Sequence, residues 1–445
     1  MSKDFLYGVS SSSFQIEGDD GKQGRGKSVW DVLCEQKGIV HNNDNAIIAT
    51  DHYNRYKEDV KLISDLGANS YRFSTSWSRI LPDGIGKINE QGVAFYDRLI
   101  DELLEKNITP MLTLYHWDLP QALQEKGGLF HTDFSKWFLE YAEIIAKKYG
   151  DRVEYYNTFN EPINCVHTSY HAGLFAPRLK LSMDDTLICL QNMWLGHGEA
   201  YDVLHMHNKK AKVGIAKSTF EEYPINDNPK TIEMAKKHYF SNFDGQRPDD
   251  ETIEVYLDSL FFGKYPKYVL DKNKKFSEYV QKTGTKSYCG KIDFLGINTY
   301  SGNPIDENGC EVGHPQGTEY NAMGSALDEN GLYWGVKFMN ERYQVPIYIT
   351  ESGMASDDIL QNCKVQDTMR SKLLIRNLKA VEKLRNEKVD IRGYYVWSIL
   401  DNFEWLLGYS KRFGLVYVDY NTLKRIPKDS YYTYQKYIKE FKNEG

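Results

Sequence analysis

The sequence predicts an α/β fold, a single-domain (β/α)₈ TIM barrel with extended loops after its strands. Three observations support this prediction. Runs rich in apolar and β-branched residues recur eight times in the 445 residues, helical patterns lie between them, and no Pro-rich or low-complexity linker divides the chain. Strands that alternate with helices form a covered parallel sheet, and eight such units close into a barrel. We therefore expect one domain over residues 1–445.

Each predicted strand is a short run enriched in apolar, β-branched and aromatic residues. An open doubly wound sheet is the alternative, but no GxGxxG turn follows the first strand. In chain order, the predicted strands are Phe5–Phe14, Ser70–Trp77, Thr109–Trp117, Val153–Asn160, Lys212–Phe220, Asp293–Tyr300, Pro346–Glu351 and Ile391–Ser398.

Helical patterns fill the connections between these strands. In Tyr53–Leu66, apolar residues recur at helical spacing, and Gly67 stands where a glycine would end the helix. Gly92–Lys106 repeats the pattern. The connections Asn164–Ala211 and Ser301–Val345 are too long for simple crossovers, so we expect extra helices and loops in both.

Composition and charge exclude several classes of function. The net charge of −7 and the lack of a basic cluster argue against a nucleic-acid partner. The start MSKDFLYGVSSSS lacks the apolar core of a signal peptide, and no stretch has the about 20 apolar residues of a membrane span. The six cysteines show no CxxC pair or zinc spacing. We expect free thiols in the cytoplasm and no metal or organic cofactor.

Polar and aromatic residues follow the predicted strands, where barrel enzymes place their active sites. Taken singly, a glutamate there is usually a solvated loop residue, and a histidine or tryptophan usually belongs to the core. Together, they predict a functional rim. The residues are Gln15, Glu17, Arg72, His116, Trp117, Asn160, Glu161, Asn298, Tyr300, Glu351, Trp397, Asp401, Glu404 and Trp405.

Two carboxyls on this rim indicate a reaction. Glu161 and Glu351 follow the fourth and seventh strands, about half-way round the barrel mouth from each other. Glycoside hydrolysis needs one protonated carboxyl for the leaving oxygen and one ionised carboxyl for the anomeric carbon. The aromatic content of 14% is compatible with a sugar cleft, but also with a large core.

Several segments show a resemblance to a known family, the glycoside hydrolase family 1 of β-glucosidases. The combination of TFNEP and ITESG is its most specific part. The matching segments span almost the whole chain in order: FLYGVSSSSFQIEG, DHYNRYKEDV, YRFSTSWSRILPDG, TLYHWDLPQAL, TFNEP, FLGIN, YITESG and VWSILDNFEWLLGYSKRFGLVYVDY.

The resemblance implies a role for each matching residue. Glu161 would be the general acid/base and Glu351 the nucleophile, with Arg72 and Tyr300 beside Glu351. Trp397 would stack under the sugar ring, and Asn160 would hold the 2-hydroxyl. The residues expected to bind substrate are Gln15, His116, Trp117, Asn160, Asn298, Tyr300, Trp397, Glu404 and Trp405.

The electrostatics of these residue types agree with the implied roles. Arg72 and the Tyr300 hydroxyl would favour the charged form of Glu351. Glu161 would be less solvated and would feel the charge of Glu351, which raises the pKa of Glu161. When Glu351 becomes a glycosyl ester, Glu161 is free to ionise and act as a base. We expect a carboxyl separation of about 5–5.5 Å and retention of anomeric configuration.

The leaving-group side departs from the family pattern. Ile163 replaces the tryptophan after Asn-Glu-Pro, Phe175 begins Phe-Ala-Pro-Arg in place of His-Ala-Pro-Gly, and Ser325 replaces a tryptophan after Met-Gly. Trp334 lies downstream, either as a substitute for that tryptophan or as a packing residue. The usual TENG of the family reads TESG here, and Ser352 in place of asparagine is expected to have little effect on substrate binding. These changes predict standard sugar selectivity with unusual aglycone selectivity.

Two alternative functions remain open from the sequence. One is a 6-phospho-β-glucosidase. Glu404 argues against it, as does Phe413 in place of a tyrosine, although Lys411 is present. The other is a catalytically silent sugar-binding barrel, which normally lacks a carboxylate. We expect a small β-glucoside or oligosaccharide as substrate, with galactosyl or fucosyl groups, transglycosylation and a homo-oligomer left open.

Overall fold

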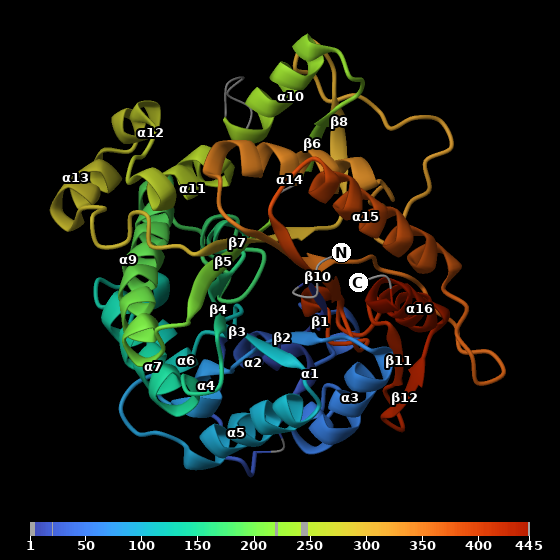
Figure 1. The fold of residues 1–445 in the computed structure, drawn as a ribbon. Coiled ribbons are helices and arrows are strands. Elements are labelled where there is room, and N and C mark those ends of the chain that lie inside the picture. Colours follow the sequence, from blue (N-terminus) through green and yellow to red (C-terminus); the bar gives the residue numbers. More distant parts are fainter. Residues whose placement is uncertain (1–4, 20, 219–220, 242–247, 444–445) are drawn as a thin grey trace.

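The eight expected strands form a closed parallel barrel, which confirms the predicted fold class. The computed structural model describes residues 5–19, 21–218, 221–241 and 248–443 (Figure 1). Around the ring the order is β1, β2, β3, β4, β5, β7, β9 and β10. The strands are β1 (Leu6–Ser10), β2 (Ser70–Ser74), β3 (Thr109–Tyr115), β4 (Tyr155–Asn160), β5 (Lys212–Ser218), β7 (Phe294–Thr299), β9 (Ile347–Ser352) and β10 (Ile391–Trp397).

Several predicted strands extended too far at their carboxyl ends. The prediction Phe5–Phe14 was wrong beyond Ser10, because the chain turns there into the short helix α1 (Ser13–Ile16). Trp77 likewise begins α4 (Trp77–Ile80). The residues that follow β1 and β2, Ser11–Ser13 and Thr75–Ser76, are polar but as buried as the strands, so neither burial nor the apolar residues beyond them show where pairing stops. The end of Lys212–Phe220, residues 219–220, lies outside the described residues.

Helices surround the barrel (Figure 1). The helix predicted at Tyr53–Leu66 is α3 (His52–Leu66), and its C-cap Gly67 has a φ of 83°. The one predicted at Gly92–Lys106 is α5 (Glu90–Glu105). The other long helices are α7 (Phe134–Tyr149), α9 (Met183–His207), α10 (Pro229–Phe240), α11 (Ile253–Phe262), α13 (Lys274–Thr283), α14 (Glu329–Tyr343), α15 (Thr368–Asn386) and α16 (Asp429–Asn443).

Short helices and strands lie outside the barrel, several of them in the long connections between its strands. The sequence analysis did not predict the two-stranded parallel sheet of β6 (Glu221–Pro224) and β8 (Gly302–Ile305), which lies outside the barrel beside α10 and α14 (Figure 1). The remaining elements are α2 (Val29–Cys34), η1 (His41–Asn43), α6 (Gln121–Gln124), η2 (Gly128–Phe130), α8 (Pro162–Val166), η3 (His167–His171), η4 (Asp249–Glu251), α12 (Lys267–Lys272), η5 (Trp405–Leu407), β11 (Val416–Asp419) and β12 (Lys424–Pro427).

Large side chains close the amino-terminal end of the barrel interior. Met111, Phe294, Tyr348 and Tyr395 come from four strands and pack together there. A side chain at Gly8 would not fit, because its Cβ would lie 2.2 Å from the Tyr395 ring. This packing fills the barrel interior at that end, and the predicted site residues lie at the opposite, carboxyl ends of the strands.

Two further findings concern the described part of the chain as a whole. None of its helices has both the length and the apolar character needed to cross a lipid bilayer. The six cysteines are all free thiols.

Candidate active site

Glu161 and Glu351 lie on the carboxyl-terminal rim of the barrel and are almost completely buried. Glu161 follows β4, with only 7% of its surface exposed, and Glu351 lies in β9 with 3% exposed. The backbone of Glu161 has a φ of 45°, in the left-handed region, and its N–H donates to the Ala216 carbonyl of the next barrel strand at 2.7 Å. Such backbone is costly for a residue other than glycine and is frequent at functional sites.

Arg72 and Tyr300 contact Glu351 directly. The Nη1 of Arg72 donates to Oε1 of Glu351 at 2.6 Å, and the Tyr300 hydroxyl donates to Oε2 at 2.6 Å. Arg72 is fully buried, and its Nη2 donates to Oδ1 of Asn160 at 2.6 Å. Both oxygens of Glu351 are thus held by donors, one of them a buried cation, and its orientation on the rim is defined.

Asn298 links this group to Glu161. Its Nδ2 donates to Oε1 of Glu161 at 2.7 Å and to Oδ1 of Asn160 at 3.0 Å, while its Oδ1 accepts from the Thr350 hydroxyl at 2.7 Å. Asn298 was predicted to bind substrate. Both N–H groups of its amide bind protein oxygens, which orients Glu161, and its contact with substrate stays a prediction.

The surroundings of Glu161 favour its neutral form. Burial is the main cause, and the nearby charge of Glu351 adds to it; together they raise the pKa of Glu161 to about 7, against the opposing hydrogen bonds from Asn298 and Asn164. A carboxyl that is partly protonated near neutral pH can donate a proton at one step and accept one at the next.

Buried polar atoms without protein partners face the site. His116 Nε2 pairs with Asn160 Nδ2 at 3.1 Å, and burial lowers the pKa of His116 far below its usual range, which leaves the ring neutral. Its Nδ1 and the Oε2 of Glu404 are both shielded from solvent, and neither has a hydrogen-bond partner among the described residues. Burial, followed by the charges of Glu351 and Glu161, raises the pKa of Glu404 to about 8. Orphaned groups of this kind are suited to ligand hydroxyls.

Aromatic rings form one wall of the site. The Trp397 ring lies parallel to His116, with centroids 5.7 Å apart, and Trp405 stacks on Trp117 at 5.2 Å. Trp117 uses its indole N–H on the Asn160 carbonyl, so only its ring is available to a ligand. Trp30, which the sequence analysis did not identify, packs behind Trp405 at 4.5 Å. Flat rings on one side and polar atoms on the other suit a sugar.

Gln15 belongs to α1, not to the end of a strand, but it lies beside Glu404: its Nε2 donates to Asn402 and to the Phe403 carbonyl at 3.1 and 2.8 Å, and a hydrogen bond from its side chain opposes the rise in the pKa of Glu404. Two other residues predicted on the rim lie in different surroundings. Glu17, two residues further on, accepts from Arg79 Nε at 2.8 Å and from the Tyr96 hydroxyl at 2.7 Å. Asp401 points into a separate group of charges.

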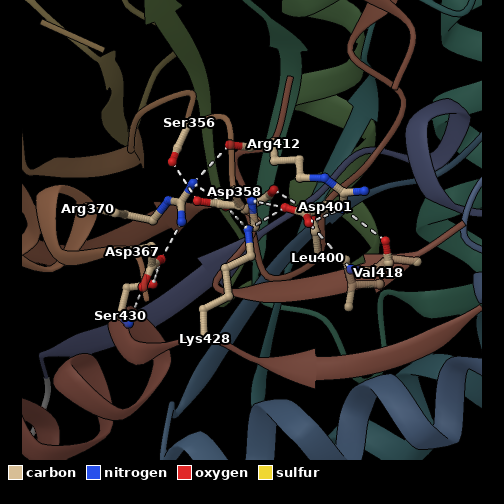
Figure 2. Close-up of polar contacts among 12 residues, drawn as sticks. Ser356, Asp358, Asp367, Arg370, Leu400, Asp401, Arg412, Val418, Lys428 and Ser430 are labelled. Atoms are coloured by element: carbon tan, nitrogen blue, oxygen red, sulfur yellow. Dashed lines mark hydrogen bonds and ion pairs between the residues drawn. The ribbon is translucent and has the colours of Figure 1, made fainter. Parts of the chain in front are cut away.

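That group, a buried ionic cluster, is shown in Figure 2. Lys428 is fully buried and donates to Asp401 at 2.6 Å and to Asp358. Arg370 contacts Asp358 at 2.9 Å, and Arg412 donates to the other oxygen of Asp401 at 2.6 Å. Paired charges in a dry interior tolerate little displacement, because a broken pair leaves an uncompensated charge.

The ionic cluster anchors the segment that carries Glu404. Asp401 lies three residues before Glu404, and the intervening Asn402 and Phe403 accept the hydrogen bonds of Gln15. Lys428 lies just before α16, so the C-terminal part of the chain helps to hold the polar wall of the site.

The four predicted aglycone residues are not gathered in one place. Ile163 is buried in α8, and Phe175 contacts the Trp117 ring at 5.6 Å. Ser325 lies in an irregular loop, where its N–H is bound by Asn321 at 3.1 Å. Trp334 packs inside α14 against Phe338 at 5.4 Å and belongs to the main hydrophobic core. This placement favours the packing interpretation of Trp334.

One residue of the site was missed altogether. Asn164, in the first turn of α8, donates through Nδ2 to Oε2 of Glu161 at 3.1 Å. The available signal was its position three residues after Glu161, which brings it back to the same side of a helical turn.

Comparisons with known proteins agree with this geometry. The model of glycosyl hydrolase family 1 matches residues 1–443. The chain is 39% identical to a 1,4-beta-D-glucan glucohydrolase of Thermotoga neapolitana, over 98% of this chain and 97% of that one. It is also 39% identical to beta-glucosidase A of Thermotoga maritima, over 98% and 97%. A solved family 1 β-glucosidase from Thermotoga maritima superposes with a TM-score of 0.89 at 37% identity, covering 99% and 98% of the two chains. The chain therefore belongs to glycosyl hydrolase family 1.

Proposed function

We propose that this protein is a retaining β-glucosidase that removes terminal non-reducing β-D-glucosyl groups. The observation that carries the proposal is the buried pair of carboxyls with different surroundings. Glu351 is held by Arg72 and Tyr300, each at 2.6 Å, whereas the pKa of Glu161 is raised to about 7. A double displacement needs one such nucleophile and one such acid/base.

In the first step, an oxygen of Glu351 attacks the anomeric carbon while the bond from that carbon to the leaving oxygen breaks. Glu161 gives its proton to the leaving oxygen, and a glycosyl ester of Glu351 remains. The ester removes the negative charge that raises the pKa of Glu161. Glu161 is then a carboxylate that takes a proton from water as the water oxygen attacks the same carbon, and Glu351 leaves with overall retention.

Names of relatives support glucose as the sugar. They include a 1,4-beta-D-glucan glucohydrolase and a β-glucosidase solved in complex with deoxynojirimycin. In this chain, the orphaned atoms of His116 and Glu404 and the rings of Trp397 and Trp405 supply matching polar and flat surfaces. We also propose a cytoplasmic location, which the free thiols support.

The structure disfavours the 6-phosphoglucoside alternative. Glu404 adds a carboxyl to the site, Lys411 is paired with Asp357 at 2.9 Å, and Phe413 is buried beside Trp397. None of the three offers a free hydroxyl or ammonium group to a phosphate.

Substrate comparison tests the proposal. We expect kcat/KM for a nitrophenyl β-glucoside to exceed that for its 6-phosphate by about 100-fold or more, because Lys411 is already paired with Asp357 and Phe413 has no hydroxyl, which leaves a buried phosphate charge uncompensated. Proton NMR of the first product should show the β-anomer of glucose. A higher kcat/KM for the phosphorylated substrate, or release of the α-anomer, would overturn the proposal, and nitrophenyl α-glucoside serves as the inactive control.

The raised pKa of Glu161 predicts a pH dependence. Only protonated Glu161 can donate to the leaving oxygen, so kcat/KM for an aryl β-glucoside should fall as the pH rises through about 7. The fall should approach about tenfold per pH unit. A profile between about pH 5 and pH 9 measures it. This fall in kcat/KM at high pH, the basic limb of the profile, should be absent when Glu161→Ala is assayed with a dinitrophenyl glucoside. If the basic limb persists in that variant, a group other than Glu161 causes it.

A further inference from the structure

Asn164 contacts the catalytic pair in a way that the family resemblance does not assign. Its Nδ2 donates to Oε2 of Glu161 at 3.1 Å, and its backbone carbonyl accepts from the Thr168 hydroxyl at 2.6 Å. Asn164 is half-buried, unlike the fully enclosed Asn298. Within the described part of the chain its side chain makes no other hydrogen bond, so its amide is free to turn over.

The other oxygen of Glu161 has a partner of defined orientation. Asn298 donates to Oε1 at 2.7 Å and to Asn160 Oδ1 at 3.0 Å, while its own Oδ1 accepts from Thr350. Turning this amide over would break three hydrogen bonds at once. Oε1 therefore always faces an N–H donor, and a proton on Oε1 would point at another hydrogen. The proton of the neutral acid belongs on Oε2, which faces Asn164.

We propose that Asn164 is a positioning residue that serves Oε2 in both protonation states of Glu161. Its N–H donates to the carboxylate, and after the amide turns over its Oδ1 accepts from the O–H of the acid. This inference rests on the proposed β-glucosidase function. In the first step, the proton passes from Oε2 to the glycosidic oxygen as the bond from that oxygen to the anomeric carbon breaks. The amide then turns back to donate to the carboxylate that is left.

The contact with the carboxylate is the stronger of the two, because hydrogen bonds to a charged group exceed those to a neutral one. Its removal should therefore destabilise the ionised form of Glu161, and the hydrogen bond from Asn164 does lower the pKa of Glu161. Other charged or titratable groups around Glu161 set the background. They are Arg72 of β2, Cys165 of α8, Lys217 of β5, Tyr256 of α11, Tyr300 after β7, Glu351 of β9 and Glu404 after β10.

Two replacements of Asn164 and one control test the proposal. Asn164→Leu keeps the approximate size and removes the hydrogen bond, whereas Asn164→Asp keeps the shape and places a carboxyl against Oε2. Thr168→Val removes the bond to the Asn164 carbonyl without reaching Glu161. The readouts are the basic limb of kcat/KM for an aryl β-glucoside and the titration of the Glu161 carboxyl by ¹³C NMR of glutamate-labelled protein, assigned with Glu161→Gln.

We expect the basic limb and the NMR titration to move upward by about one pH unit in Asn164→Leu. Asn164→Asp should move them further, because it adds a like charge, and Thr168→Val should leave them where they are. Unchanged titration in both Asn164 variants, or an equal change in Thr168→Val, would overturn the proposal and leave Asn164 a structural role. A wild-type protein inactive on every β-glycoside would instead refute the proposed function, while the NMR titration would still decide the role of Asn164.

Discussion

Replacing Glu351 with alanine is expected to lower the turnover of a nitrophenyl β-glucoside by about 10⁴-fold or more, because the covalent step loses its nucleophile. Added azide should restore activity by occupying the space of the missing carboxylate. Azide then attacks from the face that Glu351 uses, so a single displacement gives the α-glucosyl azide. Proton NMR of the product identifies the anomer.

The control for this variant must separate chemistry from folding. Among the described residues, removing Glu351 leaves the fully buried Arg72 with only Asn160 as a side-chain hydrogen-bond partner, which destabilises the fold. Glu351→Gln keeps the size and most of the hydrogen-bonding capacity, so its Tm should fall less while its turnover is lost equally. Substantial activity in either variant, or β-azide from Glu351→Ala, would refute the nucleophile assignment.

Replacing Glu161 with alanine is expected to have an effect that depends on the leaving group. Glycosides of poor leaving groups should lose about 10²–10⁴-fold in kcat/KM, because they need the proton from Glu161. A dinitrophenyl glucoside leaves without that proton, so its kcat/KM should change little. Hydrolysis of the glycosyl ester on Glu351 should then be slow, because Glu161 is also the base that takes a proton from the attacking water. Azide needs no base, and it should accelerate turnover and give the β-glucosyl azide.

The opposite stereochemistry of the two azide products is the sharpest test of the pair. It requires the two carboxyls to act from opposite faces of the same sugar. Losses in Glu161→Ala that are uniform across leaving groups would contradict the role of acid. As a matched control, Glu17→Ala removes another buried carboxyl, which lies outside the site, binds Arg79 and should not alter the leaving-group dependence.

The fold was accessible from the sequence because its signals are repeated and local. Eight apolar runs alternate with helical patterns, and errors at single ends, such as the prediction of Phe14 in a strand, do not change the count. The small sheet of β6 and β8 was missed because each strand has only four residues and the two come from different connections.

The surroundings of individual side chains were harder to predict, because the position of a residue in the sequence does not tell where its side chain points. Gln15 and Glu17 are two residues apart, yet one lies beside Phe403 and the other beside Arg79. Asp401 has the composition of a site residue, but it belongs to the ionic cluster because Lys428 and Arg412 reach it from later in the chain. Trp334 points into the core, and only the packing of α14 shows this.

Because Asp401 is paired with Lys428, the order of synthesis affects when the segment that carries Glu404 can be held in place in a newly made chain. Glu161 and Glu351 have both left the ribosome long before Lys428, which lies at the start of the last helix. Until Lys428 arrives, Asp401 lacks one of the two cations that bind it in the described structure, and the segment leading to Glu404 lacks part of its anchor. Translation thus delivers Glu161 and Glu351 before the residue that helps to secure the segment of Glu404, so the reactive groups are available before this wall of the site is fully held.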